Sequence, residues 1–180
     1  MFNTAALGIS ILSLVMSGAI ALRQLRSSQG ANVLSIILDG FKETRTTEFS
    51  ESIEYVLYHF TSAHPEHISY LDLPDPAKQH VRRIGLFYDD LGKLVAHGLV
   101  DERLVIGSYG RSVLRAWAVL CPYIYAEREK HQRLAMPYFE DLAFRAKQRT
   151  PEDVHRELGM KRFIVSEALA REIGAPPEGT

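Results

Sequence analysis

Cysteine is almost missing from this 180-residue chain, since Cys121 is the only one. A lone cysteine cannot form an intramolecular disulfide, which excludes a disulfide-held scaffold and is compatible with a reducing compartment. Net charge is also small, because 21 Lys and Arg against 22 Asp and Glu give −1. This gives no case for a whole-protein nucleic-acid or membrane-surface binder. The 46% apolar and 24% charged residues are typical of a globular protein and exclude a disordered chain.

Charge is entirely absent from residues 1–22, so all charged residues lie in residues 23–180. As a helix, residues 2–22 would rise about 31 Å, which matches a hydrocarbon core of about 30 Å. We therefore predict that residues 1–22 are a transmembrane anchor whose residues 2–22 contact the lipid bilayer. A cleaved signal peptide and a buried core helix are the alternatives. The first would need a positive start and a shorter apolar stretch, and the second would normally show a polar face.

The flanking charges predict the orientation of this anchor. Arg23 and Arg26 follow the span and no Lys or Arg precedes it, so the positive-inside rule places the C-terminal part in the cytoplasm. The prediction is a single-pass membrane protein. Small residues at close to four-residue spacing would let two such helices approach and self-associate. These candidate contact residues are Ser10, Ser13, Ser17 and Ala21.

The remainder predicts an all-α fold in which residues 23–149 form a helical, bundle-like cytoplasmic domain. The clearest helix has Asp75 as N-cap and Pro76 as its first residue, and Gly98 stops it. Phe87 and Leu94 widen its apolar face. A further helical hairpin over residues 150–174 would begin with Thr150 as N-cap, and residues 175–180 are predicted to be disordered. The other helices are expected over about 23–43, 48–61, 102–106, 111–131 and 137–148.

A family resemblance supports this architecture. The stretch LFYDDLGKLVAHGLVDERLVIGSYGRSVLRAWAVLCPYIYAERE over residues 86–129, followed by YFEDL over 138–142, resembles the bacterial family called domain of unknown function 4760. Members pair an N-terminal membrane helix ending in a basic stretch, here Arg23-Gln24-Leu25-Arg26, with a cytoplasmic helical region. The resemblance covers about residues 6–146. It implies an uncleaved anchor, in this case in a bacterial inner membrane, and an all-helical domain. It carries no activity, substrate or cofactor.

Side-chain patterns give no strong chemical signal. His64 and His67 lack the three or four ligands that a zinc site needs, so we interpret them as part of a solvated loop. Asp89 and Asp90 are adjacent on a helix and point about 100° apart, so we expect exposed ion pairs rather than an acid–base pair. No nucleophile elbow, phosphate loop or zinc-protease motif occurs. No catalytic residue, metal or cofactor is therefore predicted, and an unrecognised enzyme site stays open as an alternative.

The C-terminal hairpin resembles a helix-turn-helix unit, with Gly159 in the turn. Its apolar positions are Val154, Leu158, Met160, Val165 and Ala168. Residues 151–180 contain four basic and six acidic side chains, which is the wrong sign for approaching phosphates. We therefore predict a non-catalytic protein-interaction or scaffold module that binds a protein partner or self-associates. A membrane-tethered DNA-binding regulator is the alternative from another class.

Overall fold

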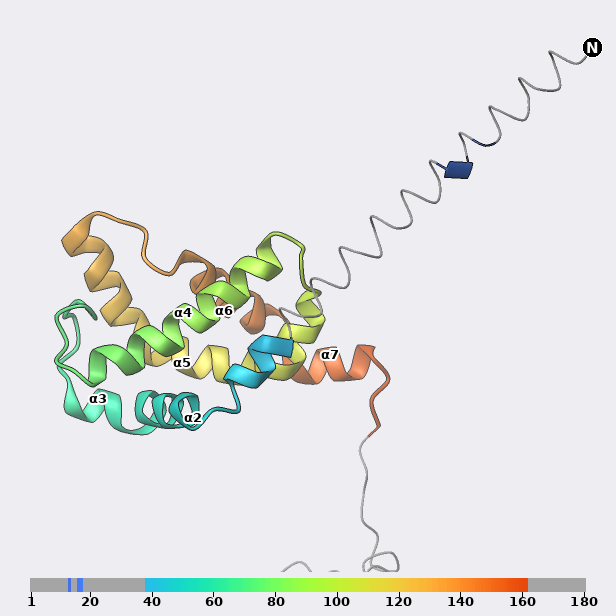
Figure 1. The fold of residues 1–180 in the computed structure, drawn as a ribbon. Helices are drawn as coiled ribbons and strands as arrows, with labels where there is room; N and C mark the ends of the chain where they lie inside the picture. Colours follow the sequence, from blue (N-terminus) through green and yellow to red (C-terminus); the bar gives the residue numbers. More distant parts are fainter. Residues whose placement is uncertain (1–12, 14–15, 18–37, 162–180) are drawn as a thin grey trace, which may run out of the picture.

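The computed structural model describes Ser13, Met16, Ser17 and residues 38–161, and in these residues the regular structure is helical with no strand (Figure 1). The predicted all-α class is thus confirmed. Residues 38–43 form a short helix that precedes the labelled elements. The labelled elements are α2 (Thr47–Glu54), the π-helix η1 (Tyr55–His59), α3 (Phe60–Ala63), α4 (Ala77–Ala96), α5 (Glu102–His131), α6 (Pro137–Gln148) and α7 (Pro151–Glu157).

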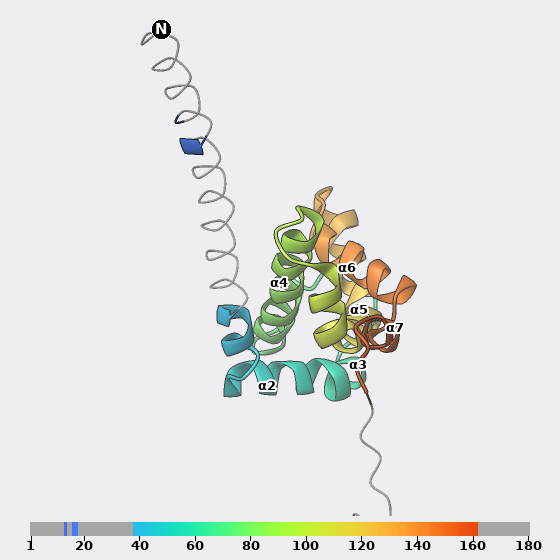
Figure 2. The same cartoon turned by 90° about the vertical axis from the view of Figure 1, so that its right-hand side faces the viewer.

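Helices α4, α5 and α6 form the centre of the domain. Helix α4 packs along α6, and both contact the long helix α5. The run from α2 to α3 crosses one end of this layer, and α7 lies on the far side of α5 from residues 38–43 (Figure 2). The core is continuous and includes the fully buried Ile84 of α4, Leu120 of α5 and Leu142 of α6.

The predicted helix over residues 48–61 is confirmed as a run of three consecutive helical elements. Thr46 caps it, because its Oγ1 accepts a hydrogen bond from the Phe49 N–H at 3.2 Å. The middle element, η1, has π-helical hydrogen bonding. Its Val56 is buried against the core, while Tyr58 is exposed.

The start of α4 differs by one residue from the prediction. Pro76 is the N-cap rather than the first helical residue, and Asp75 precedes it across a cis peptide bond. The end is as expected, since Gly98 adopts a left-handed φ of +66° directly after the helix. Only a residue without Cβ adopts this conformation at no steric cost.

The predicted break in residues 107–110 is wrong, because α5 continues from Glu102 to His131. Packing of α7 explains the continuity. A Cβ on Gly107 would lie 3.2 Å from Cγ1 of Val154, and a Cβ on Gly110 would lie 3.1 Å from Cγ of Pro151. The two glycines therefore make room for α7, and the contact with α7 favours the helical conformation that glycine alone disfavours.

The start of α7 confirms the predicted cap. Thr150 Oγ1 accepts from the Asp153 N–H at 3.2 Å, and Asp153 Oδ2 accepts from the Thr150 N–H at 3.1 Å, which together form a capping box. The helix ends at Glu157, and Gly159 has the left-handed φ of +67° expected of a stop. The predicted second helix of the hairpin and the tail 175–180 lie outside the described residues.

The proposed anchor falls almost entirely outside the described part of the chain. Ser13 and Ser17 are helical and exposed there, whereas Ser10, Ala21, Arg23 and Arg26 lie outside it. Among the residues that the structure describes, no helix combines the length and the apolar character needed to cross a bilayer. The structure thus lends no support to the span over residues 2–22, which stays a prediction.

Candidate functional site

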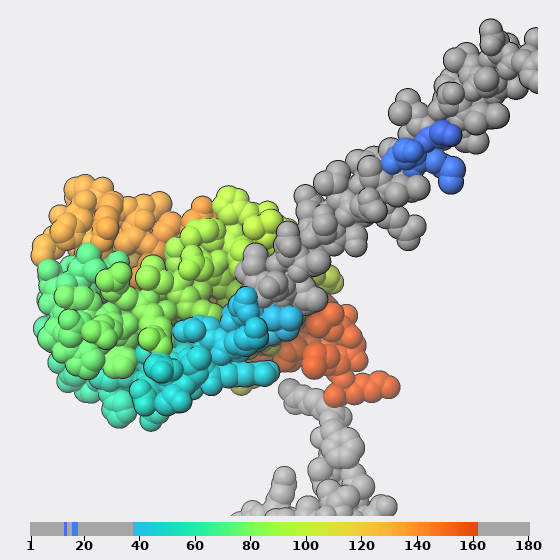
Figure 3. All heavy atoms as spheres, in the orientation of Figure 1, coloured from blue at the N-terminus to red at the C-terminus, as the bar shows by residue number. Residues whose placement is uncertain are grey.

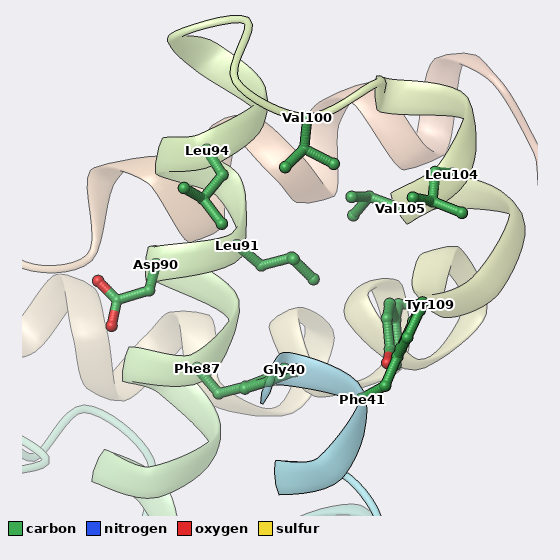
Figure 4. A pocket seen from close by; sticks show the side chains of 10 residues that line it. All are labelled: Gly40, Phe41, Phe87, Asp90, Leu91, Leu94, Val100, Leu104, Val105 and Tyr109. Carbon is green, nitrogen blue, oxygen red and sulfur yellow. The ribbon is translucent and has the colours of Figure 1, made fainter. Parts of the chain in front are cut away.

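An apolar cavity of about 160 Å³ lies between α4, the start of α5 and residues 38–43. In the space-filling view, residues 38–43 lie against the surface of α4 (Figure 3). Leu91 and Leu94 enter the cavity from α4, while Val100 covers it from the loop that joins α4 to α5 (Figure 4). The remaining lining residues are Gly40, Phe41, Phe87, Asp90, Leu104, Val105 and Tyr109.

Three aromatic rings form one side of this cavity. The Tyr109 ring centroid lies 6.0 Å from that of Phe41 and 6.0 Å from that of Phe87. The Tyr109 hydroxyl lies 3.4 Å from Thr44 Oγ1, so it has a hydrogen-bond partner outside the apolar space. These contacts hold the short helix of residues 38–43 against the body of the domain.

The Asp90 carboxylate points away from the centre of the cavity (Figure 4). It forms an ion pair with Lys93 at 2.9 Å, and both side chains are largely exposed. Hydrogen bonding to Asp90 raises the pKa of Lys93. The interior surface of the cavity is therefore built by hydrocarbon and ring atoms.

Sequence reasoning did not identify this cavity. A signal was present, since Phe87 and Leu94 lie beside the main apolar stripe of α4 and give that helix a second apolar face. What the sequence does not show is the partner for this face. Phe41 lies 46 residues before Phe87, and Tyr109 lies in the stretch where Gly107 and Gly110 predict a break in the helix. Only the tertiary structure brings them together.

Asp89 contradicts the prediction of an exposed acidic pair. It is buried, and its Oδ1 accepts hydrogen bonds from the backbone N–H groups of Tyr138 at 2.9 Å and Phe139 at 3.1 Å. These are donors of the first turn of α6, whose own N-cap, Met136, has no capping side chain. Asp89 is thus a structural cap, while Asp90 forms the exposed ion pair that was expected.

A buried carboxylate also occurs at the end of α5. Glu127 is fully buried, accepts from Ser69 Oγ and pairs with the Arg133 guanidinium, whose Nε lies 2.9 Å from Oε1. Hydrogen bonding to Glu127 raises the pKa of Arg133. The partners tie the loop before α4 and the turn after α5 to the helix, which indicates a structural role.

Ser52 and His80 resemble a nucleophile and its base, with Oγ and Nδ1 3.0 Å apart. However, the Ser52 hydroxyl also donates to the Glu48 carbonyl at 2.6 Å, so it accepts the Nδ1–H of His80 rather than giving up its own proton. Ser52 is also buried, which keeps substrate away from it. Burial and the nearby Arg83 charge lower the pKa of His80. This geometry fits a structural link between α2 and α4.

The two loop histidines do not converge. His64 Nε2 is hydrogen-bonded to the Tyr55 hydroxyl at 2.8 Å, whereas the exposed His67 faces Glu66 at 3.9 Å. No group of three or more potential metal ligands occurs in the part of the chain that the structure describes.

A comparison with protein families gives a match. The family model described as Domain of unknown function (DUF4760) matches residues 2–146, which is well over half of the chain and confirms the predicted resemblance. No curated protein and no solved structure matches the chain.

Proposed function

The chain belongs to the DUF4760 family, and from that premise we propose that it is a non-catalytic interaction or scaffold module held at a bacterial inner membrane. In this proposal the helical domain lies in the cytoplasm and residues 2–22 span the bilayer. The surface that binds the partner protein is the end of α7.

The observation that carries the proposal is the exposure of large apolar side chains at the end of α7. Leu158 and Met160 follow the last residue of α7 and are 57% and 61% exposed, although Val154 within α7 is fully buried. Methionine is an adaptable side chain that is common at protein-binding surfaces. Apolar groups that stay exposed on an ordered helix end are available to a partner.

Helix α7 presents these side chains from a fixed position. His155 Nε2 is hydrogen-bonded to the Gly107 carbonyl at 3.2 Å. Ion pairs join Arg111 to Glu152 and Arg149 to Glu157. A surface held in place before binding loses less conformational freedom when the partner docks, which favours affinity.

The polar groups of the domain support a non-catalytic role. Among the described residues, no buried side-chain nitrogen or oxygen lacks a hydrogen-bond partner. The buried acids Asp89 and Glu127 are occupied by a helix end and by Arg133, respectively. Catalysis instead needs polar groups that converge on a space that substrate can enter.

A photocrosslinking experiment tests the interaction surface in the full-length chain. A photoreactive residue at Met160 should give adducts of discrete mass in bacterial cells, and the same residue at the exposed Glu129, which lies on α5, should not. A second chain carrying M160D and the photoreactive residue at Leu158 should lose the adducts. Equal labelling from positions 160 and 129, or no adduct from position 160, would contradict the proposal.

The membrane part of the proposal rests on the sequence of residues 2–22 and on Arg23 and Arg26. The full chain should stay in the membrane fraction through alkaline carbonate extraction, and a chain starting at residue 23 should be released. A reporter that is active only in the periplasm, fused after Thr180, should stay silent. Activity of that reporter would show that the predicted orientation is wrong. Release of the full chain by carbonate would show that residues 2–22 are not a transmembrane anchor.

A further inference from the structure

We infer that the cavity between α4, α5 and residues 38–43 is a binding site for one small, neutral, apolar group about the size of a single aromatic ring. This inference is independent of the proposed interaction surface, because Leu158 and Met160 do not line the cavity. It assigns a ligand-binding role to a region with no chemically reactive group.

The size of the cavity sets the size of the ligand. Its volume is about 160 Å³. An enclosed engineered cavity of about 150 Å³ with similar aliphatic and aromatic walls binds benzene, and this cavity has a similar volume but is partly open to solvent. A ring of six carbon atoms, or a branched chain of similar volume, would therefore fill this space and make dispersion contacts with its walls.

The walls set the charge of the ligand. Leu91, Val105 and the Tyr109 ring offer no charge, and the Asp90 carboxylate points outward to Lys93 (Figure 4). The Tyr109 hydroxyl has Thr44 as its partner. A charged or strongly hydrogen-bonding ligand would lose its hydration without gaining partners, which is unfavourable. A neutral apolar group loses nothing of this kind.

The ligand can reach the cavity from solvent. Leu104 is 42% exposed, and the side chains of Phe41 and Leu94 are half-buried. These residues lie on three separate segments, so small side-chain movements would widen the opening without breaking a helix.

Fluorobenzene is a suitable probe for the full 180-residue chain in phospholipid nanodiscs. The bilayer takes up this probe without saturation, whereas a protein site saturates. We expect saturable shifts of the methyl NMR signals of Leu91, Leu94, Val100 and Val105, with no shift at the core residue Val56. Shifts that never saturate, or shifts at Val56 as large as those at the cavity residues, would overturn the inference. This titration uses the native chain alone.

Gly40 lines the cavity and offers a matched substitution, because a Cβ added there would meet nothing within 4 Å. Gly40→Leu should place a side chain in the cavity and abolish the saturable shifts. Ala63→Leu, at an exposed helical position, should leave them unchanged. Saturable binding that persists in a folded Gly40→Leu chain would overturn the assignment to this cavity.

The ring-sized group could be a free molecule or the end of a lipid acyl chain. Nanodisc lipids with a nitroxide at the chain end distinguish the two sources. If the nitroxide broadens the methyl signals of these four residues and fluorobenzene reverses the broadening, the ligand is the acyl chain. Saturable probe shifts without broadening would identify a free ligand. If neither broadening nor saturable shifts were observed, the proposed binding site would be refuted.

Discussion

The carboxylate of Asp89 on α4 caps the N-terminus of α6, with its Oδ1 3.1 Å from the backbone nitrogen of Phe139. A helix start leaves N–H groups without intrahelical partners, and an acidic group there also interacts favourably with the helix dipole. Because Met136 at the N-cap cannot accept these hydrogen bonds, a residue from another helix does. One side chain thereby couples the packing of α4 and α6 to the start of α6.

We expect Asp89→Ala to lower the free energy of unfolding by about 1–3 kcal/mol, because two N–H donors of α6 lose their acceptor. Asp89→Asn retains an oxygen acceptor and should cost less. Urea unfolding followed by circular dichroism measures both. Asp90→Ala, at the exposed neighbour, is the control and should stay within about 0.5 kcal/mol of the native chain. A similar loss for both alanine variants would refute the cap.

We expect Gly92→Ala to be strongly destabilising, by about 3 kcal/mol or more, since the added Cβ would lie 2.2 Å from the backbone oxygen of Tyr138. The main chain of α6 would have to move away from α4. Gly40→Ala is the opposite case, because its Cβ meets open space, and it should stabilise the chain by about 0.5–1 kcal/mol. Thermal melts of the two variants should shift in opposite directions.

We expect His80 to make the domain less stable in mild acid. Burial, followed by the Arg83 charge, lowers the pKa of His80 below its usual value of about 6.5. The unfolded chain therefore takes up the proton first, and the free energy of unfolding falls as the pH drops through this range. His80→Asn should reduce this acid dependence in urea titrations between pH 7.5 and 5.5. The exposed His67→Asn is the control, and an unchanged slope in His80→Asn would contradict the assignment.

We expect Tyr88 to lower stability at high pH. Its burial raises the pKa of the phenol to about 12, although the hydrogen bond with Ser112 acts in the opposite direction. The unfolded chain ionises first, from about pH 10, so a contribution on the order of 2 kcal/mol is lost between about pH 10 and 12. Hydrogen bonding to Glu140 also raises the pKa of Tyr125 to about 12. Absorbance at 295 nm should therefore show two phenolate groups ionising near pH 12 in the native chain, and Tyr88→Phe should remove one of them. A native titration identical to that of Tyr88→Phe would exclude the shift.

Local signals predicted the helices well where the chain carries its own start or stop residue. The start of α7 was marked by Thr150, and the ends of α4 and α7 were marked by Gly98 and Gly159. Caps and left-handed turns depend on neighbouring residues in the sequence, so a local pattern reveals them. The prediction failed at Gly107 and Gly110, where local propensity indicates a break. The contact of α7 with α5 outweighs that propensity, and nothing local to residues 107–110 encodes the contact.

The sequence by itself determined the helical class, the family and the absence of charge in residues 1–22. Periodicity, caps and composition are properties of adjacent residues, which a linear reading contains. Only the tertiary structure decided that Asp89 is a buried cap, that Glu127 is paired with Arg133, and that Phe41, Leu91 and Tyr109 enclose a cavity. These roles depend on which surfaces meet across long stretches of chain, and that choice is made by packing of the whole core.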